Sequence, residues 1–102
     1  NTQITAKGDF TNEGLINGVS VDDRANTVIK VGGRLTNTGK GRIYGDDIAL
    51  QADSIENSDK DYGGSEILSA VVAARGNLDL AAREIENNTA YYLSDNQVGA
   101  TL

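Results

Sequence analysis

The stretch Ile29-Lys-Val-Gly-Gly-Arg-Leu-Thr-Asn37 gives the pattern on which the rest of the chain is built. It contains a large aliphatic residue, a variable residue, a smaller apolar residue, a short corner, a large apolar residue, a polar residue and Asn. The same pattern returns in three other segments, at 4–12, 50–57 and 80–87. A pattern that recurs in this way predicts a repeat architecture, in which each unit packs on the next.

The Asn residues that end the four units mark the length of each repeat. They occupy positions 12, 37, 57 and 87, so the repeats are unequal in length. We expect the extra residues to lie in corners, between Val19 and Asn26 and between Ser58 and Gly76, because solenoid corners accept insertions. The chain is then a single domain, 1–102, with approximate units at 4–28, 29–49, 50–79 and 80–102.

Apolar and polar residues alternate inside each short unit. Ile29 and Val31 flank Lys30 and therefore share one face of a β-strand. Such a short strand is not stable alone, but stacked units pair each strand with its equivalents above and below. We therefore predict an all-β fold, a parallel β-helix of about four coils. Its apolar core column consists of Phe10, Leu35, Ile55 and Ile85.

The recurring Asn residues predict a second column. An Asn amide has two N–H donors and an acceptor oxygen, so stacked Asn side chains can bond to one another and to corner backbone groups. Asn is also a common turn residue, which is the alternative explanation. Recurrence at one position of the repeat favours a structural ladder of Asn12, Asn37, Asn57 and Asn87.

Two local features allow other folds. Asn17-Gly18 could form the two-residue turn of an antiparallel hairpin, and the alanines within 67–75 favour a helix. Hairpins do not require equivalent residues to recur along the chain, whereas stacked units do. We therefore interpret 67–75 as a strand or a lateral excursion.

The composition excludes several kinds of site. The chain has no Cys, His, Pro, Met or Trp, so it lacks the usual thiolate nucleophiles, zinc ligands and histidine bases. Only 5% of its residues are aromatic, which suits a thin stack better than a globular core. A net charge of -6 argues against nucleic acid as a partner. No apolar run is long enough to span a bilayer.

Acidic pairs are candidates for a metal site. Asp22-Asp23, Asp46-Asp47 and Asp59/Asp61 carry the oxygen ligands that calcium prefers, but no calcium-binding motif surrounds them. We interpret them as solvated corners. The sequence therefore predicts no catalytic, cofactor-binding or metal-binding residues, and no cofactor.

Tyrosines and the longest insertion are candidates for contact with a partner. Loops on a rigid scaffold often carry function, so if a partner binds, the excursion at 58–66 is where contact is expected, through Asp59, Asp61 and Tyr62. A structural role for this excursion is the favoured interpretation. Tyr44 is expected to point outward from its strand. Tyr91-Tyr92 is expected to cap the open end of the stack.

Several segments resemble the repeats of filamentous haemagglutinin-type exoproteins. They are Gly33-Arg-Leu-Thr-Asn-Thr-Gly39, Arg42-Ile-Tyr-Gly45, Ile48-Ala-Leu-Gln-Ala-Asp-Ser-Ile-Glu-Asn57, Gly76-Asn-Leu-Asp-Leu-Ala-Ala82 and Ile85-Glu-Asn87. The resemblance covers most of the chain and weakens at 58–75 and after Asn88. It implies a right-handed parallel β-helix that is exported by two-partner secretion through an outer-membrane transporter. Members of this family include adhesins, haemolysins and contact-dependent growth inhibition proteins, in which such repeats usually form the stalk.

The resemblance leads to an expected role. The chain begins at Asn1 in mid-pattern, and we take it as a fragment of a larger exoprotein, secreted or held at the bacterial outer-membrane surface. We expect a structural or adhesive stalk that presents a binding or toxic region to a host cell or a neighbouring bacterium, without enzyme activity. Two alternatives are a carbohydrate-active β-helix enzyme and a self-assembly module that associates through its coil ends.

Overall fold

The chain is all-β, as predicted. The computed structural model describes residues 1–21, 24–64, 66–88 and 102, and within these residues the chain forms β-strands and no helix. The first sheet contains β1 (Thr2–Ala6), β4 (Asn26–Val31), β7 (Asp47–Gln51) and β11 (Leu78–Ala81). The second contains β2 (Phe10–Asn12), β5 (Arg34–Thr38), β8 (Ser54–Asp61) and β12 (Glu84–Asn88). A fifth strand of the second sheet, β9 (Ile67–Ser69), pairs with β8 alone. The third sheet contains β3 (Leu15–Gly18), β6 (Arg42–Gly45) and β10 (Val71–Ala74).

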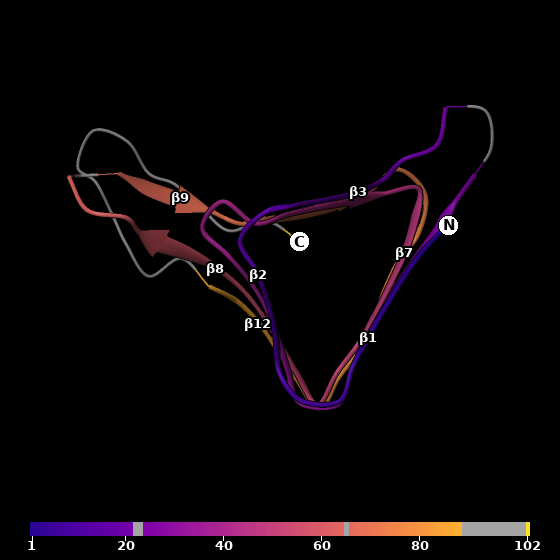
Figure 1. Cartoon of the computed structure of the whole chain (residues 1–102), viewed down its shortest axis with the longest axis horizontal. Coiled ribbons are helices and arrows are strands. Elements are labelled where there is room, and N and C mark those ends of the chain that lie inside the picture. Colours follow the sequence, from indigo (N-terminus) through magenta and orange to yellow (C-terminus); the bar gives the residue numbers. More distant parts are fainter. Residues whose placement is uncertain (22–23, 65, 89–101) are drawn as a thin grey trace.

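The chain visits the three sheets in the same order on each of its first three passes, and the described part of the fourth pass reaches the first two sheets. The strand orders β1-β4-β7-β11, β2-β5-β8-β12 and β3-β6-β10 follow the sequence, and every pair along these three paths is parallel. Viewed along the direction in which the passes stack, the sheets form the three sides of a triangle (Figure 1). The molecule is 18 Å thick in this direction, close to four strands at about 4.8 Å each.

The passes start slightly earlier than the repeat units that the sequence defines. They cover 2–18, 26–45, 47–74 and, among the described residues, 78–88. Each therefore begins two or three residues before the aliphatic residue at 4, 29, 50 or 80. Residues 19–21 and 24–25 project outward from one corner of the triangle, and the β8–β9 hairpin projects outward from another (Figure 1). These are the two places where the unequal repeat lengths predicted insertions.

The pair β8–β9 is antiparallel, so the prediction of an entirely parallel fold is wrong at this point. β8 continues past the end of β5, and β9 folds back along it with Asp59 opposite Ser69 and Asp61 opposite Ile67. The reversal occurs at Gly63 and Gly64, whose φ angles of 88° and 59° favour glycine. The excursion expected near 58–75 is thus a hairpin followed by β10, and the helical alternative for 67–75 is wrong.

Asn17-Gly18 does not form a hairpin turn. Both residues lie in β3, where Asn17 is opposite Tyr44 and Gly18 is opposite Gly45 in β6. A Cβ atom at Gly18 would overlap the Thr27 hydroxyl, so this glycine allows close packing where the chain turns toward the first sheet. The antiparallel meander that this dipeptide could have initiated is therefore absent from β3 and β6.

The core lies inside the triangle and is formed by alternate residues of the central strands. Its buried members include Ile29, Leu35, Ile43, Ile48, Leu50, Ile55 and Val72. Residues between them, such as Lys30 and Gln51, are exposed. The period-two pattern therefore directs the same side of every strand inward.

The register aligns the predicted core column. Phe10 is opposite Leu35, Leu35 is opposite Ile55, and Ile55 is opposite Ile85. Leu35 and Ile55 are buried, but Phe10 is half-buried and Ile85 is 45% exposed. The expectation that Ile85 is a core residue is therefore wrong. Among the described residues, β12 is the outer strand of its sheet, so Ile85 has an aligned described neighbour in the column on one side and not on the other.

This difference in burial gives a test of the register. We expect Ile55→Asp to lower the free energy of unfolding by about 4 kcal/mol, because it places an unpaired charge inside the stack. Ile85→Asp, at the exposed end of the same column, is expected to cost about 1 kcal/mol. Urea unfolding followed by far-ultraviolet circular dichroism measures both. Equal losses at the two positions would contradict the column.

Candidate functional site

The Asn residues of the repeat lie in one column and bond to one another. Asn12 Nδ2 donates to Asn37 Oδ1 at 2.9 Å, Asn37 Nδ2 to Asn57 Oδ1 at 2.8 Å, and Asn57 Nδ2 to Asn87 Oδ1 at 3.0 Å. The same Nδ2 groups also donate to backbone carbonyls, at Gly14, Val71 and Ala70 respectively. Asn57 is 0% exposed, so its amide has exchanged water for protein partners.

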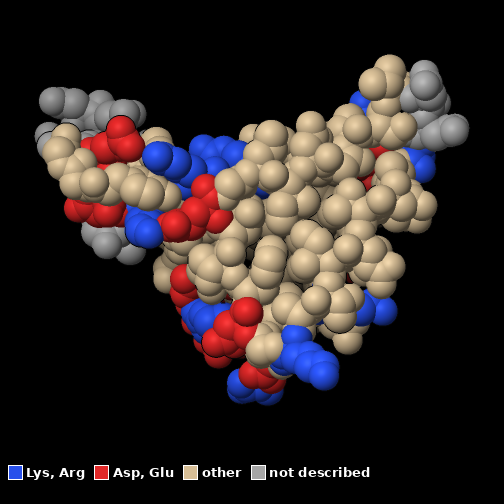
Figure 2. Space-filling model, viewed as in Figure 1, with Lys and Arg blue, Asp and Glu red and all other residues tan. Residues whose placement is uncertain are grey.

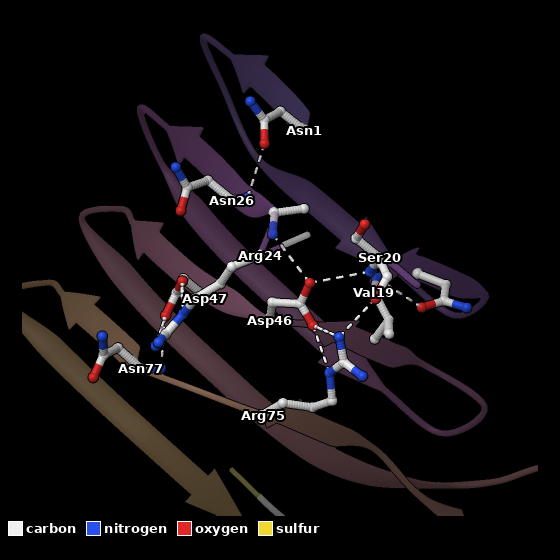
Figure 3. Close-up of polar contacts among 11 residues, drawn as sticks. Asn1, Val19, Ser20, Arg24, Asn26, Asp46, Asp47, Arg75 and Asn77 are labelled. Atoms are coloured by element: carbon white, nitrogen blue, oxygen red, sulfur yellow. Dashed lines mark hydrogen bonds and ion pairs between the residues drawn. The ribbon is translucent and has the colours of Figure 1, made fainter. Parts of the chain in front are cut away.

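A second column of Asn and Asp residues was not anticipated. Asn1 Oδ1 accepts from the Asn26 backbone N–H at 3.0 Å, and Asp47 Oδ1 accepts from the Asn77 backbone N–H at 2.9 Å. The side chains follow the edge of the first sheet where its strands begin (Figure 3). A sequence signal was present, since Asn or Asp stands three residues before each aliphatic residue at 4, 29, 50 and 80.

Asp46 is a buried carboxylate rather than a solvated corner. It is 2% exposed and accepts from the backbone N–H groups of Ser20 and Ala25, each at 3.0 Å (Figure 3). It also pairs with the Arg75 guanidinium. These backbone hydrogen bonds, followed by the contribution of Arg75, lower the pKa of Asp46. The corner interpretation fails here because the backbone at Ser20 and Ala25 covers the carboxylate.

Other acidic residues at the corners are paired with arginines. Asp47 accepts two hydrogen bonds from Arg24, at 2.5 and 2.6 Å, which lower the pKa of its carboxyl. Asp53 accepts two from Arg83, at 3.1 and 3.0 Å. Figure 2 shows basic and acidic residues interleaved at the corner between the first two sheets. In the described part of the chain, no three acidic residues gather to hold a metal ion. Asp22-Asp23 lies outside the described residues.

The predicted partner-binding residues lie on the hairpin of β8 and β9 and differ in accessibility. Asp61 is exposed, and its carboxylate accepts from the Gly63 backbone N–H at 2.8 Å. Asp59 is 6% exposed, so it does not present its carboxylate to a partner as expected. The cause is the return of β9, which places Ser69 opposite Asp59.

Tyr62 connects the hairpin to the preceding pass. Its hydroxyl accepts from the Lys40 backbone N–H at 3.0 Å. Two ammonium groups lie over its ring, with Lys40 Nζ 4.9 Å and Lys60 Nζ 5.3 Å from the ring centroid. Lys60 also forms an ion pair with Glu13 at 2.5 Å. Tyr62 therefore anchors the excursion, and Gly39 leaves room for its ring.

Within the described residues, the other tyrosines do not join Tyr62 in an aromatic surface. Tyr44 lies in β6 beside the inward-facing Ile43 and is half-buried, in the outward position expected of it. The predicted cap, Tyr91-Tyr92, falls outside the described residues.

No family model matches the chain, and no curated protein or solved structure is significantly similar to it. Among the described residues, no helix is long and apolar enough to cross a membrane.

The Asn column predicts a loss of stability that depends on position. Asn57→Ala removes the bridge between Asn37 and Asn87, leaving buried polar groups without partners. We expect it to lower the free energy of unfolding by about 3 kcal/mol. Asn17→Ala is the matched control on an exposed strand position, with an expected cost of about 0.5 kcal/mol. Urea titration measures both, and a small effect at Asn57 would refute the structural role of the column.

Asp46 predicts a pH dependence of stability. Its pKa is lower in the folded chain than its ordinary value of 3.8, so folding favours the charged form. The stabilisation is complete above the pKa of the unfolded chain and is lost as the pH falls through the lower, folded-state pKa. We therefore expect Asp46→Asn to destabilise the protein at neutral pH, with a difference from wild type that shrinks in acid below about pH 4.

Arg75→Gln separates the two causes of the lowered pKa of Asp46. It removes the guanidinium but keeps the backbone donors of Ser20 and Ala25, which contribute most. We expect this variant to retain most of the acid dependence. The thermal unfolding midpoint of each variant, measured as a function of pH across the acid range, checks both expectations. The same pH dependence of the midpoint in wild type and Asp46→Asn would contradict the role of Asp46.

Proposed function

We propose that the chain is a segment of a right-handed parallel β-helix that serves as the stalk of a large secreted bacterial exoprotein of the filamentous haemagglutinin type. The observation that carries this proposal is the alignment of equivalent residues in successive passes, above all the bonded column of Asn12, Asn37, Asn57 and Asn87. Each pass is then one coil, and each coil contacts its neighbours along a single axis.

The direction of coiling follows from a general rule. A connection between two parallel strands of one sheet is right-handed in nearly all proteins, because the strands themselves have a right-handed twist. In each of the first three coils the chain leaves the first sheet, crosses the other two and returns to the first beside its starting strand. On this view the β8–β9 hairpin is an insertion at a corner of the third coil.

A stalk requires stiffness along its axis, and cross-coil contacts supply it. Backbone ladders join the coils on three sides, and the Asn column adds side-chain bonds inside the stack. On the outer face, Arg34 reaches Glu56 at 2.5 Å in the next coil and Glu86 at 3.7 Å in the coil after that. These contacts favour a rod that holds other regions of a polypeptide away from the cell surface.

The proposal includes the surroundings in which the stalk works. An outer-membrane transporter would export the chain, and the host or bacterial receptor would meet the exoprotein at the cell surface. A structural rather than enzymatic role is supported by the pairing of corner carboxylates with arginines, as in Asp46–Arg75 and Asp53–Arg83. Association between exposed coil ends remains part of the proposal, because unpaired strand edges attract other strands.

Lengthening the stack tests the proposal. Residues 26–76, the two central coils, are inserted again after Gly76 in one, two or three further copies. The insert preserves the Asn37–Asn57 and Arg34–Glu56 contacts. We expect each copy to lengthen the rod by about 10 Å at constant cross-section, because it adds two coils. Small-angle X-ray scattering measures both dimensions.

The control carries inserts of the same composition in scrambled order. We expect these inserts to remain unfolded and to leave the length of the ordered core unchanged. A closed or half-closed barrel cannot accept further coils, so loss of cooperative unfolding in the true repeats would refute the stalk.

A further inference from the structure

A shallow groove runs across the outer face of the first sheet. It has a volume of about 400 Å³ and crosses β4 and β7 to the start of β11. Val28 and Ala49 in its lining alternate with buried residues along their strands, which places the groove on the face opposite the core. Its lining residues are Asn26, Thr27, Val28, Asp47, Ile48, Ala49, Asn77 and Asp79. The groove therefore extends along the stacking direction, across three successive passes.

One wall of the groove is the second column of Asn and Asp residues. Asn26 and Asp47 are opposite each other in the register, and the Asn77 backbone N–H bonds to Asp47. Figure 3 shows the three side chains in a row along the ends of the strands. Asn26 is exposed, and its side-chain amide bonds to no residue that the structure describes, so it presents both donor and acceptor to a ligand.

The floor of the groove is small and apolar. Val28 is opposite Ala49, and Ala49 is opposite Asp79. Val28 and Ala49 are both half-buried. Val28 and Ala49 leave a trough beside this polar column, and Asp79 places an exposed carboxylate at its far end. The combination offers hydrogen-bonding groups at the side and apolar surface below.

We propose that this groove binds an extended, uncharged polysaccharide chain that lies along the stacking axis, with about one sugar for each of the three passes it crosses. Amides and carboxylates bond well to sugar hydroxyls, and the C–H face of a sugar ring can pack on Val28 and Ala49. A sugar in an extended β-linked glycan advances by a length close to the spacing of the passes. A repeating protein surface thus meets a repeating ligand in register.

Other polymers fit the groove less well. The Asp47 carboxylate is paired with Arg24, but the exposed carboxylate of Asp79 and a net charge of -6 disfavour polyanions. An added peptide strand needs free backbone donors and acceptors. The two strands under the centre of the groove, β4 and β7, are already paired with a neighbouring strand on each side. The side chains of the groove are therefore best suited to bond to the hydroxyl groups of a sugar. The inference does not rest on the stalk, because the stack would lengthen in the insertion experiment whether or not a glycan binds.

The test uses β-1,4-linked oligomers of glucose and of N-acetylglucosamine, from one to six sugars long, titrated into the isotope-labelled 102-residue chain. We expect saturable shifts of the amide resonances of Val28, Ala49 and Asp79. Affinity should rise about tenfold for each sugar up to three, the change expected from one more hydrogen-bonded pair, and then level off. Heparin and an unstructured peptide serve as the competing classes.

Two variants on β7 complete the design. Ala49→Arg fills the floor with an outward side chain and should weaken binding by at least about tenfold. Gln51→Arg adds the same charge two residues away, outside the groove, and should change affinity by less than about twofold. Unchanged thermal midpoints show that both variants are folded. No binding by any oligomer, equal binding of one and three sugars, equal effects of the two variants, or preference for heparin or peptide would each overturn the inference.

Discussion

The register between successive passes is the constraint on which the other features depend, and the buried Asn column enforces it. A strand displaced by one residue would turn Asn37 or Asn57 outward and bring Thr36 or Glu56 into the core. The buried amides would then lose partners that water cannot replace. The apolar column, the corners and the positions of both excursions follow from the register that these bonds select.

The central columns could be predicted because they depend on spacing alone. A large apolar residue followed two residues later by Asn recurs four times, and the register pairs those residues as the recurrence implies. The exposure of Ile85 could not be read from the same pattern, because equivalent residues in the centre and at the end of a stack have the same sequence context. Burial depends on how many neighbours cover a strand.

The candidate site was predicted less completely, for a different reason. The insertion containing Asp61 and Tyr62 was located correctly, but the burial of Asp59 depends on β9 returning along β8. Asp46 was likewise interpreted as a surface acid, but the backbone N–H groups of Ser20 and Ala25 bond to its carboxylate. Both carboxylates are covered by segments that interrupt the repeat, and a repeat pattern contains no information about such segments.

The β8–β9 hairpin also changes the cost of ordering the chain. The bonded residues of the Asn column are 20 to 30 residues apart, so their contacts close long loops. Asp61 and Ile67, in contrast, pair across a few residues. Among the described strand pairs, this hairpin closes the shortest loop and loses the least chain entropy before its first contact forms. The antiparallel β8–β9 hairpin is therefore the strand pair that an unfolded chain can form at the lowest entropic cost.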